Sequence, residues 1–273
     1  MNRYGGELVH QSSDEYGPIE IVDFQHALRC LHFGNKTQQS AMLLSNPFIL
    51  VHKYAQAMML PLSWKKPQRA LILGLGSGSI ARYLYNYCPE LILDAVELRG
   101  EVIDIAKEYF LLPEQDKRFT VYHESAFDWL NNQQTETDKL NVKSPRTQSD
   151  TLYDMIFVDM FLTTEAGTDI TINVTTCIDK LAIMLNNDGI LILNQIGNSI
   201  HSYPALDALL KNFPDQLHSI DVETLNTIFI ASRGSIPDSI DRDGFYDTEI
   251  SYMLPFRNYF EKMNPVGNYS LPE

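Results

Sequence analysis

The feature that most constrains this chain is a glycine-rich segment placed between an apolar run and a predicted helix. The run Ala70-Leu71-Ile72-Leu73 is followed directly by Gly74-Leu75-Gly76-Ser77-Gly78-Ser79, and helical spacing begins at Ile80. A short continuous apolar run is typical of a strand that is buried on both faces, as in a parallel sheet. Glycines after such a strand let the backbone turn sharply and approach a ligand closely, because no Cβ intervenes.

The alternation of strand and helix continues along the chain. Further strands are predicted at Leu91–Val96, Phe119–Tyr122, Met155–Val158 and Gly189–Leu193, with helices at Ile80–Cys88, Glu101–Tyr109, from Ala126 onward and at Thr171–Leu185. This rhythm predicts an α/β fold with a Rossmann-like, largely parallel sheet and helices on both faces. After Ile196 the pattern is looser, with a helix at Pro204–Asn212, a strand at Thr227–Ala231 and a terminal helix at Met253–Lys262.

The residues before this region follow a different pattern. Partial alternation at Ile19–Val22 and Ala27–Phe33 predicts short strands, and Pro47–Leu60 has helical spacing. We therefore expect a small N-terminal β-domain with a linking helix at residues 1–62, and a larger Rossmann-like domain at 63–273. Residues 131–151 are polar and contain almost no apolar side chain, so we expect a mobile surface insertion there.

Composition and charge narrow the function classes. The chain of 273 residues has 35 acidic and 21 basic side chains, a net charge of −14, whereas a protein that grips phosphate backbones needs a cationic face. No apolar run reaches the roughly 20 residues that cross a bilayer, and residues 1–10 hold no signal-peptide core. The cysteines and histidines have no ligand spacing. We expect a cytoplasmic protein that binds no nucleic acid, membrane or metal.

An acidic residue stands at the distance from the glycine segment that adenosine binding requires. Glu97 ends the second predicted strand, nineteen residues after Gly78, where an acidic side chain meets the two ribose hydroxyls of a nucleoside. The sequence motif of dinucleotide-binding proteins has a third glycine at the position where this chain has Ser79. Its absence favours S-adenosylmethionine, or a relative, over NAD.

Two further strand ends carry polar residues. In such folds the adenine lies near the loop after the third strand, where Glu124 or Ser125 is placed to bond its exocyclic amine; alternatively both residues only cap the following helix. The fourth strand ends at Asp159, on the edge of the sheet where ligands bind in this architecture. A carboxylate there can stabilise a sulfonium ion or accept the proton of an amine nucleophile.

At these residues the chain resembles the spermidine synthase family, the polyamine aminopropyltransferases. The matching segments are Gln39-Ser40, Val51–Tyr54, Leu71–Gly78, Val96–Leu98, Tyr153–Asp159 and Gly189–Gln195. The resemblance implies a small N-terminal β-domain before a methyltransferase-like Rossmann domain, and a homodimer. It implies transfer of an aminopropyl group from decarboxylated S-adenosylmethionine to a diamine such as putrescine.

The resemblance also implies roles for individual residues. Asp159 is the expected proton acceptor, and the expected substrate contacts are His52, Tyr54 and Gln195. The expected contacts of the sulfonium donor are Gly74, Gly76, Ser77, Gly78, Glu97, Leu98, Glu124, Ser125 and Ala126.

The chain departs from the family on the acceptor side. Ser77 stands where the family usually carries an aspartate that holds the distal ammonium of the polyamine, and Leu162 replaces the second acid of an Asp-x-x-Asp-Pro loop. Ser125 replaces the family's acidic residue in the adenine loop unless Glu124 takes its place. A tyrosine-rich substrate segment is not recognisable at Ile220–Glu223. Burying an unpaired ammonium is costly, so the resemblance implies a divergent member.

Three functions stay open from the sequence. The first is aminopropyl transfer to a small-molecule amine, which need not be putrescine, with Asp159 as base. The second is an S-adenosylmethionine-dependent methyltransferase, in which Met160–Leu162 form an apolar acceptor wall and Arg82, Lys53 or Gln39 pairs with the donor's α-carboxylate. The third is a nucleoside-binding protein without catalysis.

Overall fold

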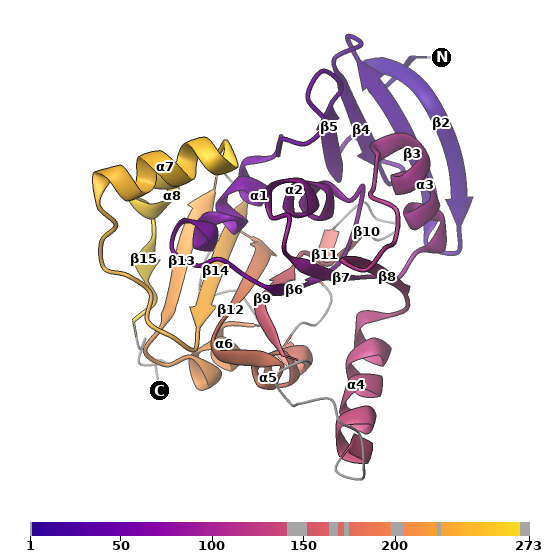
Figure 1. Cartoon of the computed structure of the whole chain (residues 1–273). Helices are drawn as coiled ribbons and strands as arrows, with labels where there is room; N and C mark the ends of the chain where they lie inside the picture. Colours follow the sequence, from indigo (N-terminus) through magenta and orange to yellow (C-terminus); the bar gives the residue numbers. More distant parts are fainter. Residues whose placement is uncertain are drawn as a thin grey trace.

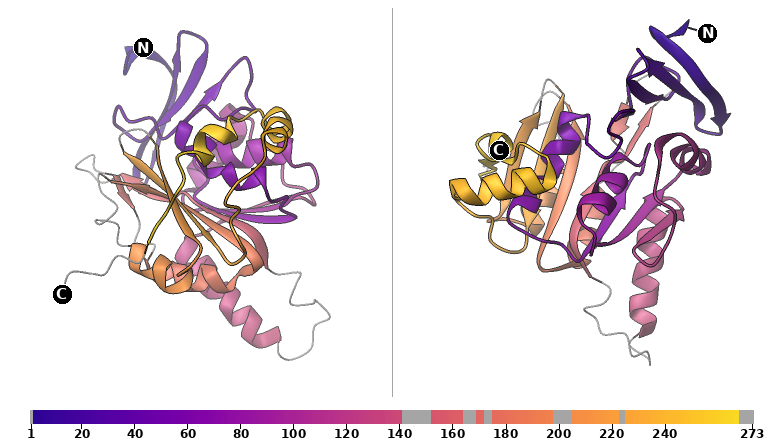
Figure 2. Two further views of the ribbon diagram at one scale, coloured as in Figure 1. Left: turned by 90° about the vertical axis from the view of Figure 1, so that its left-hand side faces the viewer. Right: turned by 45° about the horizontal axis from the view of Figure 1, so that its top comes forward.

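The computed structural model describes residues 2–140, 152–163, 169–171, 175–197, 205–222 and 225–267. These residues form a small antiparallel sheet and a large mixed sheet that is covered by helices on both faces (Figures 1 and 2). None of the helices among the described residues is long and apolar enough to span a bilayer.

The small sheet has five antiparallel strands in sequence order. They are β1 (Asn2–Arg3), β2 (Gly6–Asp14), β3 (Gly17–Phe24), β4 (Leu28–His32) and β5 (Ser40–Leu43). The alternation in the sequence predicts β3 and β4 but not β2, whose side chains are mostly polar and partly exposed. Ile19 and Ile21 of β3 pack against Val102 and Ile105 of helix α3 (Gly100–Phe110), and α3 thereby joins the two sheets.

The large sheet has eight strands in the order β15-β13-β14-β12-β9-β6-β7-β8. The strands are β6 (Arg69–Leu73), β7 (Ile92–Glu97), β8 (Phe119–His123), β9 (Tyr153–Val158), β12 (Leu185–Ile196), β13 (Leu217–Val222), β14 (Asn226–Ser232) and β15 (Asn264–Pro265). The five from β12 to β8 are parallel, and β14, β13 and β15 add antiparallel pairs at one edge. A separate two-stranded hairpin, β10 (Phe161–Thr163) with β11 (Asp169–Thr171), follows the end of β9.

Helices cover both faces of the large sheet and create two cores. One core holds Ala70 and Ile72 of β6 together with α1 (Lys53–Met58), the 3₁₀ turn η1 (Leu60–Ser63), α2 (Ser79–Tyr87), α7 (Arg242–Tyr252) and α8 (Phe256–Phe260). The other holds Leu71 and Leu73 with α4 (Ala126–Leu140), α5 (Thr175–Ile183) and α6 (Leu206–Asn212). Successive strand residues point to opposite faces, which explains why the run at β6 is apolar throughout. The predicted α/β fold class is confirmed.

Two predicted segments begin or end at different residues in the structure than the sequence predicts. The helix predicted at Pro47–Leu60 is limited to α1 and η1, and both pack against the core of the large sheet. The predicted insertion at 131–151 is helical up to Leu140, where α4 ends, and residues 141–151 lie outside the described residues.

Two more helices begin and end elsewhere than predicted. Thr171 belongs to β11, where β-branched residues pair with β10, and the predicted helix begins only at Thr175. The predicted terminal helix at Met253–Lys262 is wrong in its first part. Met253 has a φ of 52° and ends α7, and α8 begins after Pro255.

Candidate functional site

A cavity of about 220 Å³ opens at the carboxyl ends of β6, β7 and β9, between the large sheet and the small one. Its sheet-side wall includes Gly74, Leu75, Gly76, Glu97, Ser125 and Asp159. The opposite wall includes Tyr16 and Phe33 from the small sheet and its turns, and His52 and Tyr54 from the start of α1. Parallel strands end together at one edge, and the polar residues that follow them therefore meet there.

The glycine segment is shaped by contacts that a side chain would prevent. Gly74 has a φ of 89°, and a Cβ on it would lie 2.3 Å from the carbonyl oxygen of Asp159. Gly76 has a φ of 53°, and its Cβ would lie 2.9 Å from the Ser40 Oγ. Gly74 therefore lets the ends of β6 and β9 approach each other backbone to backbone, and Gly76 leaves room for the Ser40 side chain.

Glu97 holds the glycine segment in place. One oxygen of its carboxylate accepts the Leu75 N–H at 2.9 Å and the Gly76 N–H at 3.3 Å, and the other accepts the Arg99 N–H at 2.9 Å. Burial raises the pKa of Glu97, and these three N–H groups oppose that shift. A carboxylate offers about four acceptor positions, so a free position remains for a hydroxyl in the cavity.

Asp159 stands at the end of β9 with two polar side-chain partners. The Asn194 Nδ2 donates to its Oδ1 at 2.8 Å, and the Tyr54 hydroxyl also bonds to it. Burial raises the pKa of Asp159 to about 6, and the bonds from Asn194 and Tyr54 counteract part of that rise. The Asn226 Nδ2 in turn donates to the Asn194 Oδ1 at 2.9 Å. A carboxyl with a pKa near 6 changes its protonation in the range that suits a general base.

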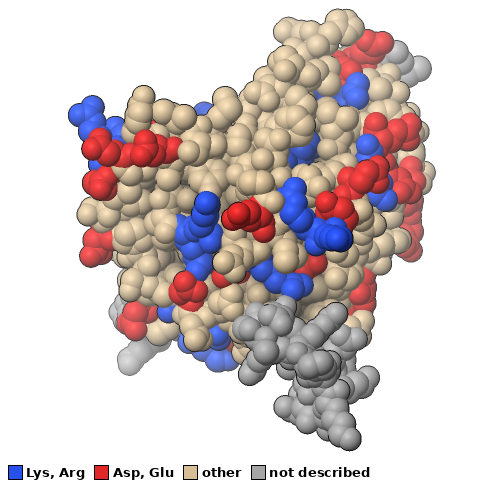
Figure 3. Space-filling view, in the orientation of Figure 1, with Lys and Arg blue, Asp and Glu red and all other residues tan. Residues whose placement is uncertain are grey.

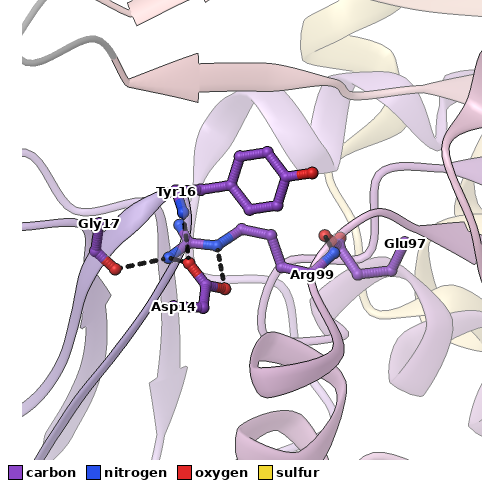
Figure 4. A network of polar contacts seen from close by, with 5 residues as sticks. All are labelled: Asp14, Tyr16, Gly17, Glu97 and Arg99. Atoms are coloured by element: carbon purple, nitrogen blue, oxygen red, sulfur yellow. Dashed lines mark hydrogen bonds and ion pairs between the residues drawn. The ribbon is translucent and has the colours of Figure 1, made fainter.

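The charge of the described cavity wall is negative. Glu97 and Asp159 are its acids, and Arg99 is the one arginine or lysine that lines the described part. The Arg99 guanidinium points away from the carboxylate of Glu97 and binds Asp14 through two nitrogens at 2.9 and 2.8 Å (Figure 4). The described wall therefore offers two carboxylates and no unpaired guanidinium or ammonium, a setting that favours a cationic ligand.

Several residues that shape the site were not predicted from the sequence. Tyr16, Phe33 and Arg99 come to the cavity through the packing of the small sheet, and Asn194 reaches Asp159 because β12 lies beside β9. The Gln39 Nε2 is buried without a hydrogen-bond partner, so this wall holds a donor that a ligand could satisfy. The sequence does carry a signal for Asn194, because this residue directly follows the apolar run of a predicted strand.

The structure brings most of the predicted site residues to the cavity. Among its lining residues are Asp159, Gly74, Gly76, Glu97, Leu98, Ser125, Ala126, His52 and Tyr54. Four predicted residues are not among them: Ser77, Gly78, Glu124 and Gln195.

Each of these four residues lies elsewhere for a definable reason. Ser77 is fully buried within the glycine loop, where its N–H donates to the Ser40 Oγ at 3.2 Å. A Cβ on Gly78 would lie 2.5 Å from the Leu112 side chain. Glu124 accepts from the Asn132 side chain at an exposed position. Gln195 is buried in β12, and its neighbour Asn194 is the residue that reaches Asp159.

Of the three candidates for an α-carboxylate partner, the cavity includes Gln39 but neither Arg82 nor Lys53. Arg82 is 1% exposed, and its guanidinium donates to the carbonyl oxygens of Pro47, Ser77 and Phe110 at 2.6, 3.4 and 2.5 Å. Burial lowers its pKa to about 10. Arg82 thus fastens the loop before α1 and the end of α3 to the glycine segment.

Neither the surface charge nor the arrangement of histidine, cysteine and carboxylate side chains indicates a second binding site in the described part of the chain. Figure 3 shows acidic and basic side chains interspersed on one face, without a continuous basic stripe. Within the described ranges, no group of three or more histidine, cysteine or carboxylate side chains is arranged to hold a metal ion.

Comparison with known sequences finds polyamine aminopropyltransferases of several bacteria over part of the chain. No family model matches the chain. The polyamine aminopropyltransferase of Chromobacterium violaceum is 37% identical over 125 residues, which are 45% of this chain and 48% of that protein. The chain spans about half the length of the curated relatives it matches.

Comparison with solved structures covers more of the chain. A probable spermidine synthase from Corynebacterium glutamicum superposes with a TM-score of 0.67 and 16% identity over 96% of this chain and 99% of that one. Human methyltransferase-like protein 13, solved in complex with SAH, gives 0.58 and 18% over 81% of this chain and 97% of that one. These identities establish the fold alone. By sequence over less than half of its length the chain is similar to polyamine aminopropyltransferases, and by fold over nearly all of it to a probable spermidine synthase.

Proposed function

We propose that this chain is a transferase that moves an aminopropyl group from a sulfonium derivative of adenosine to an amine. The observation that carries the proposal is the described cavity wall, which presents the carboxylates of Glu97 and Asp159 while its one guanidinium is paired with Asp14. Two carboxylates without a competing cation suit a sulfonium donor and an amine acceptor. The sequence match to polyamine aminopropyltransferases supports the same reaction class.

The charge of the wall also bears on which donor is used. S-adenosylmethionine carries an α-carboxylate, which loses much of its solvation on binding and is held best by a positive partner. Among the described wall residues, Arg99 is the one lysine or arginine, and Asp14 occupies its guanidinium, which leaves the neutral amide of Gln39 as a donor for a carboxylate. Decarboxylated S-adenosylmethionine has no such carboxylate. This difference supports the decarboxylated donor.

The chemistry assigned to Asp159 is proton acceptance. An acceptor amine attacks through its lone pair, so an ammonium form must first lose a proton, and the Asp159 carboxylate takes it. The nitrogen then forms a bond to the aminopropyl carbon attached to sulfur, the bond between that carbon and sulfur breaks, and its electron pair neutralises the sulfonium to the thioether methylthioadenosine. Asn194 and Tyr54 orient the carboxylate during this step.

The acceptor proposed here has a single amine near Asp159. A second ammonium would need a second acid, and Ser77 offers none and is buried away from the cavity. The sequence also has Leu162 in place of the other acid that the resemblance predicts. The structure of the wall thus supports a monoamine, or a diamine whose distal end reaches solvent.

A methyltransferase is the second candidate. The observation that favours it is the buried Met160, which lines the cavity directly after Asp159 and gives the acceptor side an apolar surface. The fold likeness to methyltransferase-like protein 13 is compatible with it. This reading requires that S-adenosylmethionine binds although its α-carboxylate lacks an unpaired cation among the described wall residues.

Calorimetric titration with four compounds tests the proposal. Decarboxylated S-adenosylmethionine and methylthioadenosine are expected to bind more tightly than S-adenosylmethionine and S-adenosylhomocysteine. The reverse order would support methyl transfer, and absence of binding by all four would overturn both enzyme functions. Incubation of the decarboxylated donor with a panel of monoamines and diamines, followed by mass spectrometry, then identifies the acceptor by a gain of one aminopropyl group. The cytoplasmic location and the homodimer stay predictions.

A further inference from the structure

We propose that Arg99 is a positioning residue that fixes the turn between β2 and β3 over the nucleoside end of the cavity, so that Tyr16 forms part of the donor site. The inference rests on the proposed function, because it concerns how the same cavity holds its adenosine ligand. No motif predicts this contact, since Asp14 and Arg99 lie 85 positions apart in the sequence.

The guanidinium of Arg99 forms hydrogen bonds with residues that precede and follow Tyr16 in the turn. It donates to the two carboxylate oxygens of Asp14 at 2.9 and 2.8 Å, and to the carbonyl oxygen of Gly17 at 3.0 Å (Figure 4). The same Asp14 carboxylate accepts the N–H of Tyr16 at 2.9 Å. Asp14 and Gly17 are the paired residues that close the turn. The two residues flanking the turn are therefore held by one side chain.

The ion pair between Arg99 and Asp14 is largely shielded from solvent, and two aromatic rings lie beside the guanidinium. The Arg99 side chain is 5% exposed and that of Asp14 20%. The Arg99 Cζ lies 4.4 Å from the ring centre of Phe33 and 5.9 Å from that of Tyr16, and both rings line the cavity. A bidentate arginine–carboxylate pair fixes direction as well as distance, so the pair orients the Tyr16 side of the wall.

The other end of Arg99 is tied to the acid that is proposed to hold the ribose. Its backbone N–H donates to the Glu97 Oε1 at 2.9 Å, while the other oxygen of Glu97 holds the glycine segment. Arg99 thereby links Glu97, the acid proposed to bind the ribose, to the turn that carries Tyr16 in the opposite wall of the cavity. Loss of the guanidinium releases the turn without removing any group proposed to touch the reacting atoms.

A second ion pair in the same sheet provides a matched control. Arg29 of β4 binds Asp23 through two nitrogens at 2.9 Å and donates to the carbonyl oxygen of Tyr109 in α3 at 3.1 Å. It also connects the small sheet to the large domain, and its pair is partly buried, but neither residue lines the cavity. Arg29→Ala therefore reports what loss of such a connection does to stability alone.

The experiment measures methylthioadenosine affinity by calorimetry and donor and acceptor KM by kinetics. We expect Arg99→Ala to weaken methylthioadenosine binding and raise donor KM by about tenfold, with acceptor KM changed less than about twofold. Arg29→Ala should lower the melting temperature but leave the affinity as in the parent protein. In a Tyr16→Ala background, Arg99→Ala should have little further effect on affinity, because the two residues act through one contact.

Three results separate this inference from the proposed function. If the parent protein binds none of the adenosine compounds, the proposed function itself fails. If the parent binds but Arg99→Ala binds equally well, the positioning role is overturned while the proposed function stands. Equal losses for Arg99→Ala and Arg29→Ala, or full additivity with Tyr16→Ala, would reduce Arg99 to a structural connection and would also overturn the inference.

Discussion

Replacement of Asp159 by asparagine should stabilise the protein at neutral pH and abolish turnover. The pKa of Asp159 rises from its usual value of 3.8 to about 6 because the carboxylate is buried. The folded state therefore binds more protons than the unfolded state between about pH 4 and 6, and stability falls as the pH rises through that window. Above it the ionised group destabilises the fold by about 3 kcal/mol, since each pKa unit corresponds to about 1.4 kcal/mol.

Two features of the structure reduce this magnitude. Asp159 lines the cavity, so water there screens part of the charge. An asparagine retains an oxygen for the Asn194 amide but offers an N–H toward the Tyr54 hydroxyl, which then has to accept rather than donate. We expect Asp159→Asn to raise the free energy of unfolding by about 1–2 kcal/mol at pH 8 and to leave it nearly unchanged at pH 4.

Urea unfolding followed by tryptophan fluorescence from pH 4 to 9 measures this difference, and product formation at saturating donor measures turnover. The parent protein should show a rate that rises with pH through about 6, because the base form is the ionised one. The variant should lose activity by about 100-fold or more while its donor affinity stays within a few fold. A stability difference that is constant over the whole pH range would refute the argument, because it would show that the charge on Asp159 is not the destabilising element.

Three further substitutions test neighbouring parts of the site. Glu97→Gln should weaken methylthioadenosine binding by about tenfold or more in calorimetry, because the amide cannot accept the N–H groups on both sides that the carboxylate accepts. Gly74→Ala should lower the free energy of unfolding by about 3 kcal/mol or prevent folding, because its Cβ would meet the Asp159 carbonyl oxygen. As a control, Gly5 also has a positive φ but has open space around it. Gly5→Ala should therefore lower the free energy of unfolding by only about 1 kcal/mol in the same denaturation assay. Asn194→Ala should move the pH midpoint of the rate above about 6, because its amide lowers the pKa of Asp159; an unchanged or lower midpoint would contradict this role.

The cofactor half of the site is largely readable in the sequence because it depends on local geometry. A buried strand that ends in glycines can be followed by a helix only through a tight turn, and parallel strands carry their end residues to one edge. Glu97 and Asp159 follow from that rule, and both line the cavity. Ser77 and Gly78 belong to the same motif, but Ser77 is fully buried, Gly78 packs against Leu112, and neither residue lines the cavity.

The contacts on the acceptor side cannot be predicted from local sequence patterns. Gln195 and Asn194 are adjacent in β12, and only the facing of the strand decides which of them meets Asp159. Long-range contacts also explain why Arg82, a predicted partner of the donor carboxylate, does not line the cavity. Arg82 is a cation close to the glycine segment in sequence, but three carbonyl groups from distant segments occupy its guanidinium.

By itself, the sequence determined the α/β architecture, the glycine turn and the acids at the ends of two strands, because these depend on hydrophobic periodicity and on residues close together in the chain. Only the tertiary structure decided that Asp14 pairs with Arg99, that Tyr16 lines the cavity and that Asn194 orients Asp159. Those contacts join segments separated by tens of residues. Their geometry comes from how two sheets pack through α3, which no local pattern encodes.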